Sequence, residues 1–209
     1  MICNSNEGLQ KCTDGLKATS EAVGLRFNNK KCEVMSNNSV DANIKLEQEA
    51  VKVSNSFTYL GSKIVSNGST TCEIKVRIGK ANAQFGKLTN IFKSKHLNTQ
   101  TKLRIYNATI VPIVLYGSET WHLYSNDSKK LNAFHRKCLR KILGIAPLDK
   151  VRNSEVMKRT GMREMTDVVM ERRLRWFERV ARMKNNRLPK KIMKWKPPGK
   201  RSRGRPKLT

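Results

Sequence analysis

The spacing of apolar residues changes near residue 68 and divides the chain into two parts. Before that point, apolar residues recur at helical spacing from Leu9 to Val23, and Gly24 follows as the expected end of a helix. Short segments in which apolar and polar residues alternate come next, and such alternation is typical of strands with one buried face. These segments are 24–36, with a predicted turn at Asn28-Asn29, and 44–46, 51–53 and 57–64. The first part is therefore predicted to be a helix packed on a small antiparallel sheet.

After Gly68 the apolar period becomes 3.6, which is typical of helices. The first predicted helix begins with a capping-box pattern, Thr70-x-x-Glu73, and its apolar face continues to Phe92. Later helices are predicted from the same spacing and from Pro and Gly residues that stop a helix. They cover 98–112, where Pro112 should end or kink the helix, 127–142, 153–160 and 166–183. The fold class is therefore predicted to be α+β, with a small sheet before an α-helical bundle.

The charge is distributed as unevenly as the apolar pattern. The formal net charge is +27, and residues 1–60 contain seven basic and seven acidic residues, so the whole excess lies in 61–209. Self-repulsion on this scale favours a polyanionic partner, most often nucleic acid. Residues 184–209 contain eleven Lys or Arg and no acid, together with Pro and Gly, and are predicted to form an extended, mobile tail. No long apolar span or lipidation pattern occurs in the sequence, so no membrane partner is expected.

Residues that could support metal-dependent or nucleophilic chemistry form no recognisable pattern. The five cysteines contain no CxxC pair and have no metal-ligand spacing with the three histidines, which favours reduced intracellular thiols. No two acidic residues are adjacent, whereas template-directed polymerases hold two metal ions between converging carboxylates. Asp14 and Glu21 share one helix face, which a solvated surface explains. From the residues alone we expect no catalytic residue, no metal site and no bound cofactor.

Basic stripes on two predicted helices are candidates for phosphate binding. The last predicted helix has arginines three, four and three residues apart, which form one stripe beside an apolar stripe, and the 127–142 helix repeats this arrangement. Such a helix can pack on a core and offer guanidinium groups to phosphates, although an ordinary solvated face has the same pattern. The candidate residues are Arg172, Arg175, Arg179 and Arg182 in the last helix and Lys129, Arg136 and Arg140 in the earlier one.

The tail contains a shorter motif with three interpretations. Arg203-Gly204-Arg205-Pro206 lies among further basic residues and is similar to the core of an AT-hook. In that interpretation, Gly and Pro keep the backbone extended while Arg203 and Arg205 enter a narrow A·T minor groove. A non-specific basic tail and a nuclear localisation signal are the two other interpretations.

Several longer segments occur in an order that is typical of one enzyme family. They are GLRFNNKKCEVM (24–35), FTYLGSKI (57–64), IVPIVLYGSETW (110–121), FHRKCLRKILGI (134–145), SEVMKRTGM (154–162), RRLRWFERVARM (172–183) and LPKKIMKWKPPGKRSRGRP (188–206). Together they resemble the C-terminal part of non-long-terminal-repeat retrotransposon reverse transcriptases, closest to jockey and RTE-like elements. The resemblance covers nearly the whole chain, and Cys32 stands where the family motif usually has Thr.

The resemblance implies roles for individual residues and segments. Lys31 occupies the position of a motif lysine that approaches the leaving phosphate, and Tyr59, Leu60 and Gly61 lie at the centre of a primer-grip-like motif. The family's Asp-Asp hairpin precedes the position of Met1, so the carboxylates that hold Mg²⁺ in the parent enzyme are not in this sequence. The implied domains are a palm remnant (1–68), a helical thumb (69–146), post-thumb helices (147–183) and the basic tail (184–209).

These observations predict a nucleic-acid-binding C-terminal fragment of an RNA-directed DNA polymerase that is not an enzyme by itself. DNA, RNA or an RNA–DNA hybrid is the expected partner, with the upstream polymerase domain and self-association through the exposed palm edge as further partners. An intracellular and nuclear location is expected. Two alternatives are a non-enzymatic chromatin-binding protein that acts through its AT-hook-like tail, and a non-functional pseudogene product.

Overall fold

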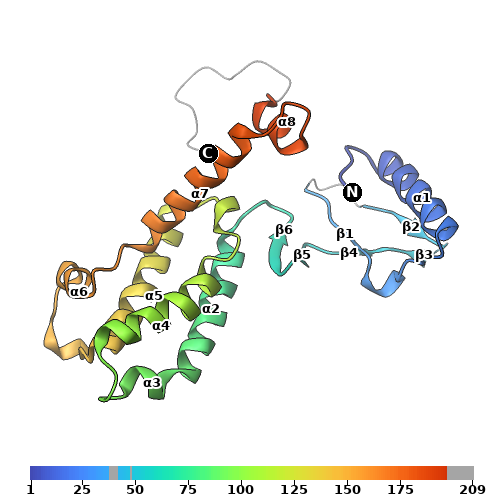
Figure 1. Ribbon diagram of the computed structural model, residues 1–209. Helices are drawn as coiled ribbons and strands as arrows, with labels where there is room; N and C mark the ends of the chain where they lie inside the picture. Colours follow the sequence, from blue (N-terminus) through green and yellow to red (C-terminus); the bar gives the residue numbers. More distant parts are fainter. Residues whose placement is uncertain (38–41, 48, 197–209) are drawn as a thin grey trace. The chain divides into compact units, whose positions relative to one another are not determined.

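The computed structural model describes residues 1–37, 42–47 and 49–196, which form two compact units, Met1–Glu73 and Ile74–Thr209 (Figure 1). The boundary falls in the first turn of α2, close to the boundary predicted after residue 68. In chain order the elements are α1 (Asn6–Ala22), the 3-10 helix η1 (Asn29–Lys31), β1 (Glu33–Val34), β2 (Lys45–Leu46), β3 (Glu49–Ala50), β4 (Lys52–Val53), β5 (Ser56–Tyr59), β6 (Ser62–Val65), α2 (Thr71–Lys87), α3 (Thr89–Lys93), α4 (Thr99–Val114), η2 (Ser118–Thr120), α5 (Ser125–Leu143), η3 (Pro147–Asp149), α6 (Asn153–Thr160), α7 (Met165–Arg182) and α8 (Leu188–Lys194). The α+β class predicted from the sequence is confirmed.

Helix α1 is capped at its start by a side chain, and one side-chain amide on the helix bonds strand β2. The hydroxyl of Ser5 accepts a hydrogen bond from the backbone N–H of Gly8 at 3.1 Å, which satisfies one free donor of the first turn. The side-chain amide of Gln10 both donates to the carbonyl and accepts from the N–H of Lys45 in β2, each at 2.9 Å. Gln10 thereby pairs with β2 as the backbone of a neighbouring strand would.

The strands of the first unit form three short pairs. β2 with β3 and β5 with β6 are antiparallel, as predicted, whereas β1 with β4 is parallel, with Glu33 beside Lys52. A parallel pair requires a long connection, and the chain between β1 and β4 provides one by forming the β2–β3 pair. The buried apolar residues of this unit form a small cluster: Val34, Ala42, Ile44, Leu46 and Val51.

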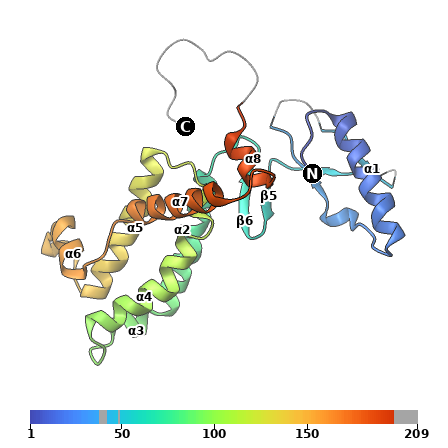
Figure 2. The same ribbon diagram turned by 45° about the horizontal axis from the view of Figure 1, so that its top comes forward.

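Helix α4 packs on α5 in the second unit, and α2 contributes side chains to the same core (Figures 1 and 2). Their ends follow the expected chemistry: the side chain of Asn98 caps α4 by accepting from Thr101 N–H at 2.7 Å, and Gly144 ends α5 with a left-handed φ of 71°. The side-chain amide of Asn132 on α5 donates to the hydroxyl of Thr166 at 3.2 Å and accepts from the backbone N–H of Thr166 at 3.3 Å. Asn132 thus fastens the first turn of α7 to α5.

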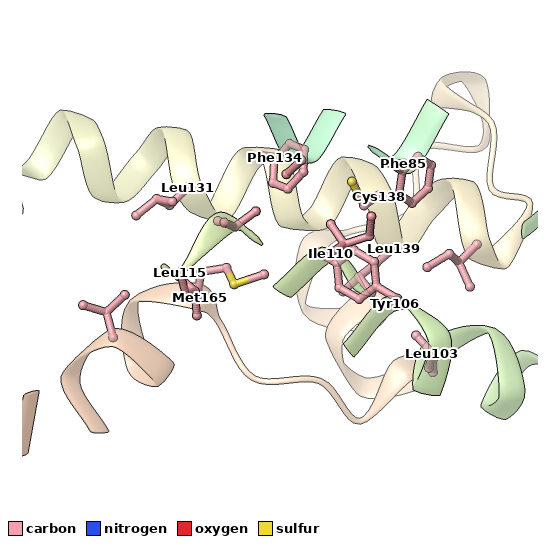
Figure 3. Close-up of a cluster of buried hydrophobic side chains, with 14 of the residues drawn as sticks. Phe85, Leu103, Tyr106, Ile110, Leu115, Leu131, Phe134, Cys138, Leu139 and Met165 are labelled. Carbon is pink, nitrogen blue, oxygen red and sulfur yellow. The ribbon is translucent and has the colours of Figure 1, made fainter. Parts of the chain in front are cut away.

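The core of the second unit is one continuous cluster of side chains from α2 to α7 (Figure 3). At its centre, Tyr106 of α4 and His135 of α5 are both fully buried, and the Tyr106 hydroxyl lies 2.8 Å from His135 Nδ1. Burial lowers the pKa of His135 to about 4, with the charge of Arg136 acting in the same direction and the backbone of Arg163 opposing it. The imidazole is therefore neutral near pH 7, and its Nδ1 shares a buried hydrogen bond with the Tyr106 hydroxyl.

The end of α4 predicted at Pro112 lies two residues too early, and the prediction for the tail was wrong. Helix α4 continues to Val114, because a proline in the last turn removes only one hydrogen bond before the helix ends. Helix α8 lies inside the segment predicted to be extended, since Pro189 is tolerated in a first turn and the Lys190 ammonium bonds the carbonyl of Ala181 in α7. Residues 197–209 of that tail lie outside the described residues. Within the described ranges, the helices are too short or too polar to cross a bilayer.

Candidate nucleic-acid interface

An open cleft of about 610 Å³ in the first unit contains Lys31 and residues of the primer-grip-like motif. Lys31, at the end of η1, lines it together with the primer-grip-like strand β5 and with Lys63 of β6. The full set of lining residues is Lys31, Glu33, Ser56, Phe57, Thr58, Tyr59 and Lys63. Residues that are distant in sequence and that were singled out separately thus share one concave surface.

The charge of this cleft is positive because its one acid is already paired. The Lys52 ammonium lies 2.9 Å from a carboxylate oxygen of Glu33, and this hydrogen bond lowers the pKa of the Glu33 carboxyl. Lys31 is exposed. Lys63 bonds the carboxylate of Glu73 through its backbone N–H, at 2.6 Å, and not through its ammonium. Two lysine ammonium groups therefore remain to attract an anion.

Two aromatic rings stand in the same cleft. Phe57 and Tyr59 pack edge to face, with centroids 6.4 Å apart, and Tyr59 is 58% exposed. Aromatic side chains beside lysines are the usual means of holding single-stranded nucleic acid, because bases stack on the rings while cations contact the phosphates. Sequence reasoning found Tyr59 but missed Phe57 and Lys63, since only the β5–β6 pairing and the position of η1 show that they face the same space.

The tip of the β5–β6 hairpin is a two-residue turn at Leu60 and Gly61. Both residues have a left-handed backbone, with φ of 47° and 81°, which is the geometry of the tight turn that matches the twist of paired strands. Glycine adopts this conformation freely, whereas a leucine there costs roughly 1 kcal/mol. The turn places Tyr59, the third residue of the primer-grip-like motif, at the end of β5 and at the edge of the cleft.

The three basic candidates on α5 differ in how the fold uses them. Arg136 makes two hydrogen bonds to Glu164, at 2.8 and 2.6 Å, at the point where α7 begins. Arg140 donates to the carbonyl of Val151 and to the side chain of Asn153, at 3.0 and 2.7 Å. These two residues join α5 to the chain that follows it. Lys129 is exposed and has no polar partner among the described residues.

Three of the four arginines in the α7 stripe lie beside an acidic side chain. Arg172 donates to the carbonyl of Leu115 at 2.6 Å and lies 4.0 Å from Glu119. Arg175 pairs with Glu171, and Arg182 lies 3.3 Å from Glu178. Arg179 is exposed, and within the described ranges nothing pairs with it. Glu171 and Glu178 stand four residues before their partners, and this spacing in the sequence is the signal that indicates the pairing.

The tail arginines and a possible metal site complete the set of candidates. Arg203 and Arg205 lie outside the described residues. In the part of the chain that the structure describes, no cluster of three or more His, Cys, Asp or Glu has the arrangement of a metal site. The candidates that remain for such an interface are the first-unit cleft and, in the second unit, Lys129 and Arg179, which have no partner among the described residues, together with the exposed ion pairs of α7.

Comparison with known proteins adds one relative. A transposon-derived protein of Caenorhabditis elegans is 25% identical to this chain over 208 residues, which are 94% of this chain and 74% of the worm protein. No protein-family model matches the chain, and no solved structure matches it. The similarity to the worm protein is consistent with a transposon-related origin.

Proposed function

We propose that this chain is the nucleic-acid-holding C-terminal part of a retrotransposon reverse transcriptase, without polymerase activity of its own. In this proposal the first-unit cleft takes the end of a primer strand, and the basic second unit contacts the phosphates of a duplex or an RNA–DNA hybrid. The two units correspond to the end of a palm and to a thumb with its following helices. Mg²⁺ would be held by carboxylates that this sequence does not contain.

The observation that supports the proposal most is the shared cleft of Lys31 and Tyr59. The two residues were assigned to two separate reverse-transcriptase-like motifs, and nothing in their spacing required them to meet. A cleft with two lysines and two aromatic rings suits a strand end, which offers both a phosphate and an unstacked base. The excess of +27, which lies entirely after residue 60, supports phosphate contacts by the remainder of the chain.

The test is a double substitution in the cleft of the intact chain. Lys31→Gln with Lys63→Gln should lower affinity for a recessed RNA–DNA primer end by about tenfold at low salt. It should also reduce the log–log slope of affinity against salt by roughly one to two. Binding with fewer phosphate contacts releases fewer counterions.

Lys30→Gln is the matched control, because Lys30 is exposed on the same 3-10 helix and does not line the cleft. It should change affinity far less than the double substitution. If both variants lose affinity equally, the cleft is not the site that binds the primer end. The same conclusion follows if the double variant keeps its affinity and its circular dichroism is unchanged.

The AT-hook-like motif favours a second candidate function, binding of A·T-rich DNA by residues 197–209 alone. Removing these residues while keeping α8 distinguishes the candidates. The polymerase-derived account expects 1–196 to keep most of its affinity for mixed-sequence duplexes, whereas the chromatin-binding account expects nearly all affinity to disappear.

A further inference from the structure

An apolar ridge runs along α7 on a face that does not pack on the core. Met170, Leu174 and Phe177 are 55%, 61% and 57% exposed, although α7 buries Val169 and Val180 against its own unit. Ala181, which is half-buried, extends the ridge by a further turn, so that the spacing is four, three and four residues. This is the spacing of the two apolar positions of a coiled-coil heptad. A ridge of large apolar side chains on one helix face indicates a surface that binds another protein.

The residues beside the ridge indicate what covers it. Arg173 and Glu178 flank it on opposite sides, five residues apart. In a parallel, in-register pair of helices, the residues in these two flanking positions meet across the seam, each with its counterpart in the other helix. Arg173 of each copy would then face Glu178 of the other, twice by symmetry. Arg173 is available for this contact, because nothing in the described part of the chain bonds it.

Other occupants and the other orientation fit less well. The 197–209 segment is strongly basic and contains only one large apolar residue, Leu208, so it cannot cover a ridge of three. An antiparallel pair would bring Glu171 and Glu178 of one copy beside those of the other, where four carboxylates repel one another. The ridge itself is bounded by Asp167 before it and by Arg182 and Met183, where the helix ends.

We propose that α7 associates with α7 of a second copy of this chain as a short parallel two-helix seam. The seam is about two heptads long, so that association is weak and depends on concentration. Each copy has a charge of +27, and salt screens the repulsion between the two copies. Added salt should therefore strengthen this association, while it weakens the binding of nucleic acid. The opposite responses separate the two properties.

Crosslinking through single introduced cysteines tests the seam and its direction. In a chain with Cys3, Cys12, Cys32 and Cys72 changed to Ser, Met170→Cys should be joined into a dimer by a short bis-maleimide, because parallel helices place the two 170 positions side by side. Arg175→Cys, on a face away from the seam, is the matched control and should crosslink much less. An equal mixture of Met170→Cys and Ala181→Cys chains should give no mixed dimer beyond that of the control, whereas an antiparallel pair would give one.

Charge reversal tests the flanking contacts independently. Arg173→Glu and Glu178→Arg should each weaken dimerisation by on the order of tenfold in sedimentation equilibrium, and the double variant should restore it, because opposite charges again face each other. Circular dichroism of each variant controls for folding. The proposal is overturned by a chain that stays monomeric at high concentration and high salt, by a dimer insensitive to these substitutions, or by the 170–181 crosslink.

Discussion

The two units of this chain differ in the size of their hydrophobic cores. The second unit encloses a continuous core of large side chains, several of them fully buried, such as Ile110 and Leu139. The first unit buries only a few small or medium apolar residues between one helix and strands of two to four residues. Yet the cleft that contains the motif residues belongs to the first unit.

The unit with the larger core is therefore not the unit that contains the candidate cleft. Buried apolar area and local helical contacts are expected to stabilise the second unit by themselves. Pairs of two strands leave edges with unpaired backbone groups, and such edges require a neighbour, a bound ligand or further strands. In a polymerase those strands would come from the upstream palm. The comparison therefore predicts a well-folded helical unit beside a unit that opens readily.

The largest expected effect is a difference in local opening between the units. Amides of β1 to β6 should exchange with solvent on the order of a hundredfold faster than the buried amides of α4 and α5, because their strands are short and their core is small. Hydrogen exchange read by mass spectrometry measures this, and limited proteolysis should cut before Gly68 first. Equal protection of both units in a monomer would mean that residues 1–60 are a complete domain.

A matched pair of core substitutions measures the difference in energy. Leu139 is fully buried and Leu46 is 4% exposed. Leu139→Ala should lower the free energy of unfolding of the helical unit by about 3 kcal/mol, through lost burial and the cavity left behind. Leu46→Ala makes the same chemical change in the first unit and should leave the helical unfolding transition nearly unchanged. Denaturant titration followed by circular dichroism at 222 nm reports this transition. Equal shifts for the two variants would show that the units unfold together.

The buried histidine gives the helical unit its own response to acid. His135 has a folded pKa of about 4, below the ordinary value of 6.5, so the unfolded chain binds more protons between these two values. The free energy of unfolding should therefore fall as the pH decreases from 6.5 to 4, by about 3 kcal/mol in total, and this cost should be absent above pH 7.

His135→Gln removes the titrating group and should flatten the dependence of stability on pH in this window. His96→Gln is the control, because His96 is exposed on the surface. If the two variants show the same dependence on pH as the unmodified chain, the buried imidazole does not cause the loss of stability in acid.

Sequence reasoning worked best where local chemistry alone decides the outcome. Apolar spacing located α1, α2 and α4 to α7, and the helices predicted over 98–112 and 127–142 match α4 and α5 to within two residues at each end. It failed where a distant partner decides: the parallel pairing of β1 with β4 and the meeting of Lys31 with Lys63 depend on tertiary contacts. The arginine stripe was located correctly on one helix, but periodicity does not show that Arg172 bonds the carbonyl of Leu115 at the end of α4.

Two arginines on α7 provide a smaller and sharper test. Arg179 has no partner among the described residues, whereas Arg172 bonds the Leu115 carbonyl. Arg179→Gln should reduce the log–log salt slope of duplex binding by about one and leave stability unchanged. Arg172→Gln should lower the free energy of unfolding by about 1–2 kcal/mol and change the salt slope less. Affinity titrations and denaturant curves on both variants distinguish these outcomes, and a reversed pattern would mean that exposure does not govern phosphate contact.

This chain is expected to hold nucleic acid through its phosphates without needing the 197–209 segment. The most direct measurement is the affinity of residues 1–196 for an RNA–DNA hybrid as a function of salt concentration. The account expects binding at low salt that falls linearly in a log–log plot, with a slope steeper than about −4, because several Lys and Arg side chains release counterions together. Absence of binding at low salt, or an affinity that does not change with salt, would contradict the account.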